Sequence, residues 1–119
     1  PGESVELTLY WRARQRTDMS FTVFVHLLDE GGQIIGQQDS VPVGGTRPTT
    51  GWMPDEIIVD RYVVPVQDGA GPGVCRIALG MYDPASGARL PLRDETGEGF
   101  ADDRLLLDRL VTIEAPTLP

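Results

Sequence analysis

Glycine and proline interrupt this sequence along its whole length, with 14 Gly and 10 Pro among 119 residues. Such frequent interruption leaves little continuous chain for long helices and favours short strands joined by turns. The length corresponds to one domain, since single domains contain roughly 100 to 150 residues. Hydrophobic residues at 40% and charged residues at 24% are typical of a packed globular fold. We therefore expect one β-rich domain over 1–119, with its core in about 4–113.

The chain has the ends expected of a piece taken from a larger protein. It begins Pro1-Gly2-Glu3, without an initiator Met or a signal-peptide pattern, and it closes on a proline-rich segment, 115–119. Its longest apolar run, 77–82, is far shorter than the roughly 20 residues of a membrane-spanning helix. We expect that this chain alone does not cross a membrane.

The charge of the chain limits its partners. It contains 18 acidic residues against 10 basic ones, all of them arginine, for a formal charge of −8. Nucleic acids and anionic lipid head groups are bound through clustered positive charge, so the composition argues against both. The single cysteine, Cys75, excludes an internal disulfide. Because it lies in phase with the apolar residues Ile77 and Leu79, we expect a buried thiol.

Alternation of period two predicts the first strand. Apolar residues stand at Val5, Leu7, Leu9 and Trp11, with polar residues between them. The segment 21–28 is apolar or β-branched on both faces, which predicts a strand in the middle of a sheet. The run 29–32 then forms a turn, and 33–39 returns as the second arm of a hairpin.

The remaining strands are shorter and separated by turn residues. The stretch 40–56, rich in Gly and Pro around Trp52, predicts a long structured loop. Further strands are expected at 57–66, 74–82, 89–92 and 104–113, with a turn at 83–87 and an acidic loop at 94–103. The leucines at 105–107 and 110 also fit helical spacing, but Val111, Thr112 and Ile113 continue a strand. Seven short strands predict an antiparallel β-sandwich of immunoglobulin-like or jelly-roll type, with a small barrel as the alternative.

Candidate catalytic groups are few. His26 is the only histidine, and its position in mid-strand favours a structural imidazole over a catalytic base. Cys75 has apolar neighbours, which are unsuited to an activated thiolate. Asp39 and Asp60 could form the paired carboxylates of a glycoside hydrolase, but each has an arginine nearby, Arg47 and Arg61, which favours structural ion pairs or turn capping. We expect no catalytic residue and no enzyme activity of this chain's own.

Metal and phosphate sites are equally weakly indicated. The acidic segments 29–30 and 94–103 could supply oxygen ligands to calcium, but their spacing fits no EF-hand, and a solvated acidic loop is the simpler interpretation. One Cys and one His fall short of a zinc site. The glycine run 69–73 leads into a predicted strand, so no helix N-terminus is present to receive a phosphate. We expect no metal and no cofactor.

Aromatic residues offer the best candidate for ligand binding. Tyr10, Trp52, Tyr62 and Tyr82 could expose faces on which a sugar ring stacks, with Asp39 and Arg61 bonding its hydroxyl groups. If three of these, Tyr10, Tyr62 and Tyr82, share one outer face of the sandwich, they form a shallow glycan platform. The alternative is that the aromatic residues are half-buried packing residues.

Several phrases of the sequence together resemble a known family. They are 9–13 (LYWRA), 21–29 (FTVFVHLLD), 38–40 (QDS), 48–50 (PTT) with Trp52, 60–62 (DRY) and 80–91 (GMYDPASGARLP). In order and spacing they are similar to the C-terminal β-sandwich domain of bacterial multi-pass membrane proteins related to the mannosyltransferase-like glycosyltransferases, which use polyprenyl-linked sugar donors. The resemblance spans about Gly2 to Ile113. It departs from the family at 74–76, where an aromatic is expected, and at Asp55, where Gly is common.

The resemblance implies an extracytoplasmic, non-catalytic accessory domain of a membrane glycosyltransferase, next to the transmembrane part of its parent. No catalytic residues carry over, because in such enzymes they lie in the membrane-embedded portion. The expected partner is a glycan or polypeptide acceptor. The alternative is a purely structural or protein-interaction domain without a ligand, which would make its contacts through an exposed sheet edge or apolar patch.

Overall fold

The chain folds into two antiparallel β-sheets, seen in a computed structural model that describes residues 4–67, 73–91 and 96–113. These ranges contain six strands: β1 (Ser4–Arg12), β2 (Thr22–Leu28), β3 (Ile34–Ser40), β4 (Ile57–Pro65), β5 (Gly73–Tyr82) and β6 (Leu105–Ile113). Two single 3₁₀ turns, η1 (Thr49–Gly51) and η2 (Ala101–Asp103), are the only helical elements in these three ranges. The all-β prediction is confirmed.

The seventh predicted strand, 89–92, is not a strand over its described part. Arg89 makes one isolated bridge to Tyr82, and Leu92 lies outside the described residues. The side chain of Arg89 contacts the turn before β6, where its Nη1 donates a hydrogen bond to the carbonyl oxygen of Asp102 at 3.0 Å. The glycine run 69–73 also lies mostly outside the described residues, apart from Gly73, which begins β5.

Among the described strands, one sheet consists of β1 and β4, and its residues alternate between the interior and solvent. Leu9 lies opposite Asp60 and Tyr10 opposite Val59. In β4 the alternation is complete, because Ile58, Asp60, Tyr62 and Val64 are buried while their neighbours are exposed. In β1 the predicted inward set that includes Leu9 is partly buried, and the residues between are exposed. The period-two prediction for β1 is confirmed.

The other sheet has the strand order β3-β2-β5-β6. All seven residues of β2 are buried, which confirms the prediction of a strand in mid-sheet with both faces covered. The hairpin from β2 to β3 turns at Asp29, whose Oδ1 accepts hydrogen bonds from the N–H groups of Gly31 and Gln33, both at 2.9 Å. After β5, Asp83 caps a second turn in the same manner, and Gly87 takes the left-handed conformation with φ 76°.

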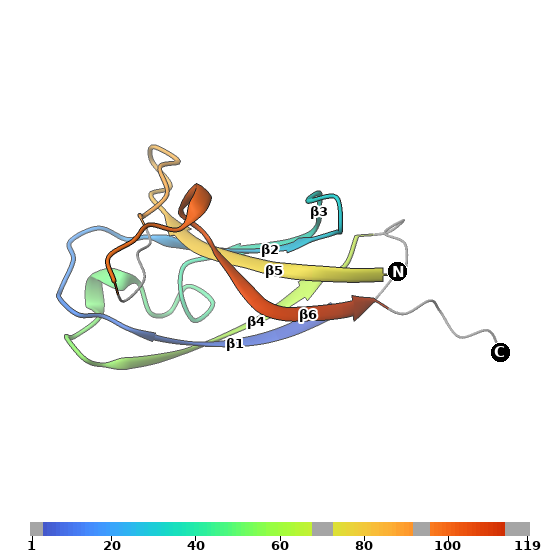
Figure 1. The fold of residues 1–119 in the computed structure, drawn as a ribbon. Coiled ribbons are helices and arrows are strands. Elements are labelled where there is room, and N and C mark those ends of the chain that lie inside the picture. The colour runs from blue at the N-terminus through green and yellow to red at the C-terminus, as the bar shows by residue number, and fades with distance from the viewer. Residues whose placement is uncertain (1–3, 68–72, 92–95, 114–119) are drawn as a thin grey trace.

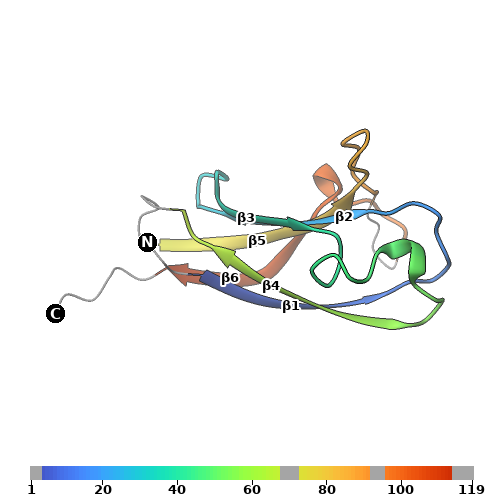
Figure 2. The same ribbon diagram turned by 180° about the vertical axis from the view of Figure 1, so that it is seen from behind.

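The core lies between the two sheets, which face each other in Figures 1 and 2. Each connection from β1 to β2, from β3 to β4 and from β4 to β5 passes from one sheet to the other. The buried cluster draws on β2, β4 and β5 and includes Val25, Ile58, Val64, Cys75 and Leu79. Cys75 is 1% exposed, so the prediction of a buried thiol is confirmed, and burial raises the pKa of this thiol.

Candidate functional site

The six residues predicted to bind a ligand do not share a surface. Trp52 and Tyr62 are buried in the core, at 5% and 3% exposure. Tyr10 is 70% exposed on the outer face of the two-stranded sheet. Tyr82 and Asp39 lie together on the outer face of the other sheet. The platform of Tyr10, Tyr62 and Tyr82 does not form, because β1 and β5 belong to different sheets and the side chain of Tyr62 points inward.

Tyr62 instead belongs to a buried network around Asp60. The carboxylate of Asp60 is fully buried, and its Oδ2 accepts hydrogen bonds from Trp11 Nε1 at 3.1 Å and from the Tyr62 hydroxyl at 2.6 Å. Its Oδ1 accepts a 2.8 Å bond from the backbone N–H of Val43, a residue held at φ 56°. Burial and the hydrogen bond to Asp60 raise the pKa of Tyr62 well above its usual value. Asp60 therefore ties β1, β4 and the loop after β3 together.

The prediction that Asp60 and Arg61 form an ion pair is wrong, because no such pair is present between these two described residues. Neighbouring strand residues point to opposite faces, so Arg61 is exposed on the outer face of the two-stranded sheet while Asp60 is buried. The position of Asp60 in phase with the apolar residues Ile58 and Val64 is the sequence signal for this burial. A charged residue in an apolar phase indicates a satisfied buried network.

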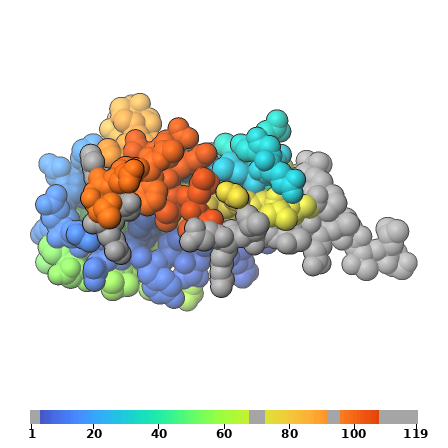
Figure 3. Space-filling view, in the orientation of Figure 1, coloured from blue at the N-terminus to red at the C-terminus, as the bar shows by residue number. Residues whose placement is uncertain are grey.

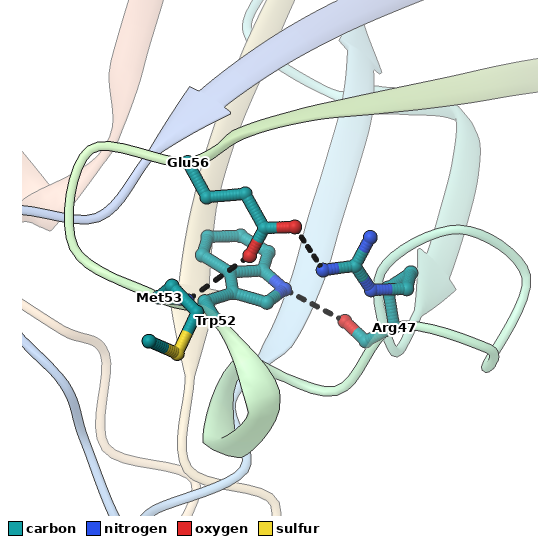
Figure 4. Close-up of polar contacts among 4 residues, drawn as sticks. All are labelled: Arg47, Trp52, Met53 and Glu56. Carbon is teal, nitrogen blue, oxygen red and sulfur yellow. Dashed lines mark hydrogen bonds and ion pairs between the residues drawn. The ribbon is translucent and has the colours of Figure 1, made fainter.

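Arg47 is also paired differently from the expectation that it would pair with Asp39. Its Nη2 contacts Glu56 Oε2 at 2.6 Å, and the other oxygen of Glu56 accepts the backbone N–H of Met53 at 3.0 Å, as Figure 4 shows. The Trp52 indole donates to the carbonyl oxygen of Arg47 at 2.9 Å. The bond from Met53 and the contact with Arg47 lower the pKa of Glu56. These contacts fix the loop between β3 and β4 and explain the burial of Trp52.

Two of the predicted residues do meet on the outer face of the four-stranded sheet. The Tyr82 hydroxyl donates to Asp39 Oδ2 at 3.0 Å across β2, and Gln37 Nε2 lies 3.5 Å from Asp39 Oδ1. Burial and the bond to Asp39 raise the pKa of Tyr82. These two residues are 43 positions apart, and no local sequence pattern pairs them.

Beside this pair, β2 presents an aromatic stack. The Phe24 ring lies 5.0 Å from the His26 ring and 4.4 Å below the guanidinium carbon of Arg89. His26 is 8% exposed. Burial lowers its pKa, the charges of Arg89 and Arg104 lower it further, and the charge of Asp39 opposes them. The packing of His26 against Phe24 agrees with the structural interpretation of this histidine.

The same outer face carries a hollow of about 530 Å³. It is lined by Leu28, Asp29, Glu30, Gly32, Val74, Arg76, Arg104 and Leu106. Its apolar part comes from strand residues, and its polar part combines two arginines with two carboxylates. Arg76 and Arg104 were not among the residues predicted to bind a ligand. The signal for Arg76 was its phase, since it alternates with the buried residues Cys75 and Ile77 on β5.

Neither a metal site nor a spanning helix is found in the described part of the chain. Across 4–67, 73–91 and 96–113, no group of three or more His, Cys, Asp or Glu side chains could hold a metal ion. Residues 94 and 95 of the predicted acidic loop lie outside these ranges. No helix in the same ranges has the length and apolar character needed to traverse a bilayer.

Comparison with known protein families, with curated proteins and with solved structures found no match for this chain.

Proposed function

We propose that this chain is a non-catalytic recognition module that binds a glycan in the hollow on the outer face of the four-stranded sheet. In its parent, a membrane protein related to glycosyltransferases, it lies on the extracytoplasmic side of the membrane. The family resemblance supports this context. The observation that carries the binding proposal is the combination of donors and acceptors around an apolar floor in one hollow.

The chemistry of the hollow suits a sugar. Arg76 and Arg104 supply hydrogen-bond donors, while Glu30 supplies an acceptor, so adjacent hydroxyl groups of one ring can be bonded from both sides. Leu28 and Leu106 offer apolar surface to the C–H face of the ring. The volume of about 530 Å³ is in the range of ligand sites, roughly 300 to 1,000 Å³.

The strand order supports an immunoglobulin-like β-sandwich as the framework of this module. In that fold one sheet is built from strands G, F, C and C′, and the second and fifth strands pair in the other sheet. The order β3-β2-β5-β6 with the pair β1-β4 corresponds to that arrangement.

A glycan array followed by calorimetry with the best oligosaccharides tests the proposal. We expect Arg76→Ala to weaken binding by about tenfold or more, because it removes a charged donor from the hollow. Arg61→Ala is the matched control, since Arg61 is exposed on the outer face of the other sheet and should leave affinity unchanged. Absence of glycan binding at millimolar concentration, or a loss of affinity in Arg61→Ala alone, would overturn the proposal.

A second candidate function is supported by the outer face of the two-stranded sheet. Tyr10, Ile57, Val59 and Val63 are 70%, 54%, 42% and 56% exposed on this one face. An apolar strip of this kind is typical of a protein-interaction surface. A domain with this function would show no glycan affinity. A photo-crosslinker placed at Val59 in the intact parent protein would then form a covalent bond with the chain that contacts this face.

A further inference from the structure

A second concave site lies at the end of the molecule where β1 ends and β6 begins, and its lining residue Leu105 stands between the hollow residues Arg104 and Leu106 in the sequence. It is a groove of about 460 Å³. Its lining is Trp11, Arg12, Ala13, Gln15, Arg16, Thr17, Phe21, Thr49, Trp52, Leu79, Gly80, Met81, Leu90 and Leu105. In Figure 3 the blue residues that follow β1 and the orange residues that precede β6 meet at this end of the molecule. The groove shares no lining residue with the hollow.

The interior of the groove offers hydrocarbon contact. Trp11 and Trp52 lie side by side there, with ring centroids 6.4 Å apart and planes tilted by 34°. Both indole N–H groups are already used inside the protein, Trp11 by Asp60 at 3.1 Å and Trp52 by the Arg47 carbonyl at 2.9 Å. The two rings therefore present only carbon to the groove. Leu79, Met81, Leu90 and Leu105 complete an apolar lining, so an occupant needs an apolar body.

The rim of the groove is positively charged. Arg12 and Arg16 line it, and Arg14 lies between them in the sequence, so three of the ten arginines of a chain with net charge −8 fall within 12–16. All three are exposed. The ion pairs found among described side chains involve Arg47 and Arg104, and none involves these three. A guanidinium cluster that makes no ion pair with the described carboxylates favours an anionic head group.

From the apolar interior and the arginine rim we propose that the groove binds a single-chain amphiphile with an anionic head, a carboxylate or a phosphate monoester. The apolar tail lies against Trp11 and Trp52, and the head contacts Arg12 and Arg16. The net negative charge of the chain argues against a general affinity for anionic surfaces, so this site depends on the local cluster. The inference goes beyond the proposed glycan function and does not depend on it.

Tryptophan fluorescence provides the test, because both tryptophans of the chain line the groove. The protein is titrated with decyl phosphate and with decanoate below the concentrations at which they form micelles. We expect a saturable change in emission with one molecule bound per protein. Decyl maltoside and decyltrimethylammonium, which have the same tail, should bind at least about tenfold more weakly, and inorganic phosphate should produce no change.

The variant Arg12→Gln/Arg16→Gln should weaken decyl phosphate binding by about tenfold or more while its circular dichroism spectrum stays unchanged. The matched control is Arg61→Gln, an exposed arginine on β4 outside the groove, which should bind as the unaltered chain does. Any of three results would overturn the proposal. They are equal binding of all four decyl compounds, binding to anionic vesicles without binding of monomeric amphiphile, and unchanged affinity in the double variant. None of these results would bear on the proposal that the hollow binds a glycan.

Discussion

The Tyr62 hydroxyl donates a 2.6 Å hydrogen bond to Asp60 Oδ2, two residues earlier on the same inward face of β4. The bond lies inside the core, where both residues are buried. A buried carboxylate is tolerated only when its oxygens are satisfied, and here they accept from Trp11, Val43 and Tyr62. The stability of the connection between β1, β4 and the loop after β3 therefore depends on one acidic group.

Asp60→Asn should lower the free energy of unfolding by about 2 to 4 kcal/mol. The amide places an NH₂ group among three donors, so at least one of them loses its acceptor. Urea unfolding followed by tryptophan fluorescence measures the change. Asp39→Asn is the matched control. Because Asp39 is exposed, this substitution should lower the free energy of unfolding by less than about 1 kcal/mol. A smaller loss in Asp60→Asn than in Asp39→Asn would contradict the assignment.

Alkaline pH should destabilise the fold through Tyr62. Its pKa in the folded chain is raised, so above about pH 10 the unfolded chain releases this proton while the folded chain retains it. Stability is therefore retained below this pH and decreases as the pH rises above it. Tyr62→Phe should reduce this alkaline loss, and it should reduce the gain in tyrosinate absorbance that accompanies unfolding. An unchanged alkaline loss in the variant would exclude Tyr62 as the cause.

Mild acid should destabilise the fold through His26. Its pKa is lowered in the folded chain, mainly by burial, so below its usual value of 6.5 the unfolded chain binds a proton more readily than the folded chain does. This stability contribution is present above that pH and is lost as the pH falls. Between about pH 7 and about pH 5, the free energy of unfolding should fall less in His26→Gln than in the unaltered chain. Parallel curves for the two proteins would refute this prediction.

Gly36→Ala should destabilise the fold by about 1 to 3 kcal/mol. A Cβ atom on Gly36 would lie 2.6 Å from the carbonyl oxygen of Pro65 and 2.8 Å from Leu27 Cδ1. The first of these is backbone and cannot move aside as a side chain can. Gly51→Ala is the matched control, because nothing lies within 4 Å of the corresponding Cβ position. Thermal unfolding of both variants should show a lowered Tm for Gly36→Ala alone.

Local features of the fold were predictable from the sequence, whereas the distribution of strands between sheets was not. Alternation predicted β1, and the Asp29 turn predicted the hairpin of β2 and β3, because these signals act over a few residues. The Asp83 turn also forms, but in the described residues the strand expected after it is reduced to one bridge at Arg89. The pairing of β1 with β4 joins residues such as Trp11 and Asp60, which are 49 positions apart, and no local pattern encodes it. Without that pairing, Tyr10 and Tyr82 could not be assigned to different sheets.

The two ends of the strand framework determine how it responds to pulling. β1 begins opposite the end of β4, at Ser4 and Pro65, and β6 ends opposite the start of β5, at Ile113 and Gly73. Figure 1 shows both of these strand ends on the same side of the molecule. Force applied between them would peel each strand from its neighbour one hydrogen bond at a time, each contributing only about 1 kcal/mol, instead of shearing many bonds together. The fold is therefore mechanically soft along the line joining its two strand ends.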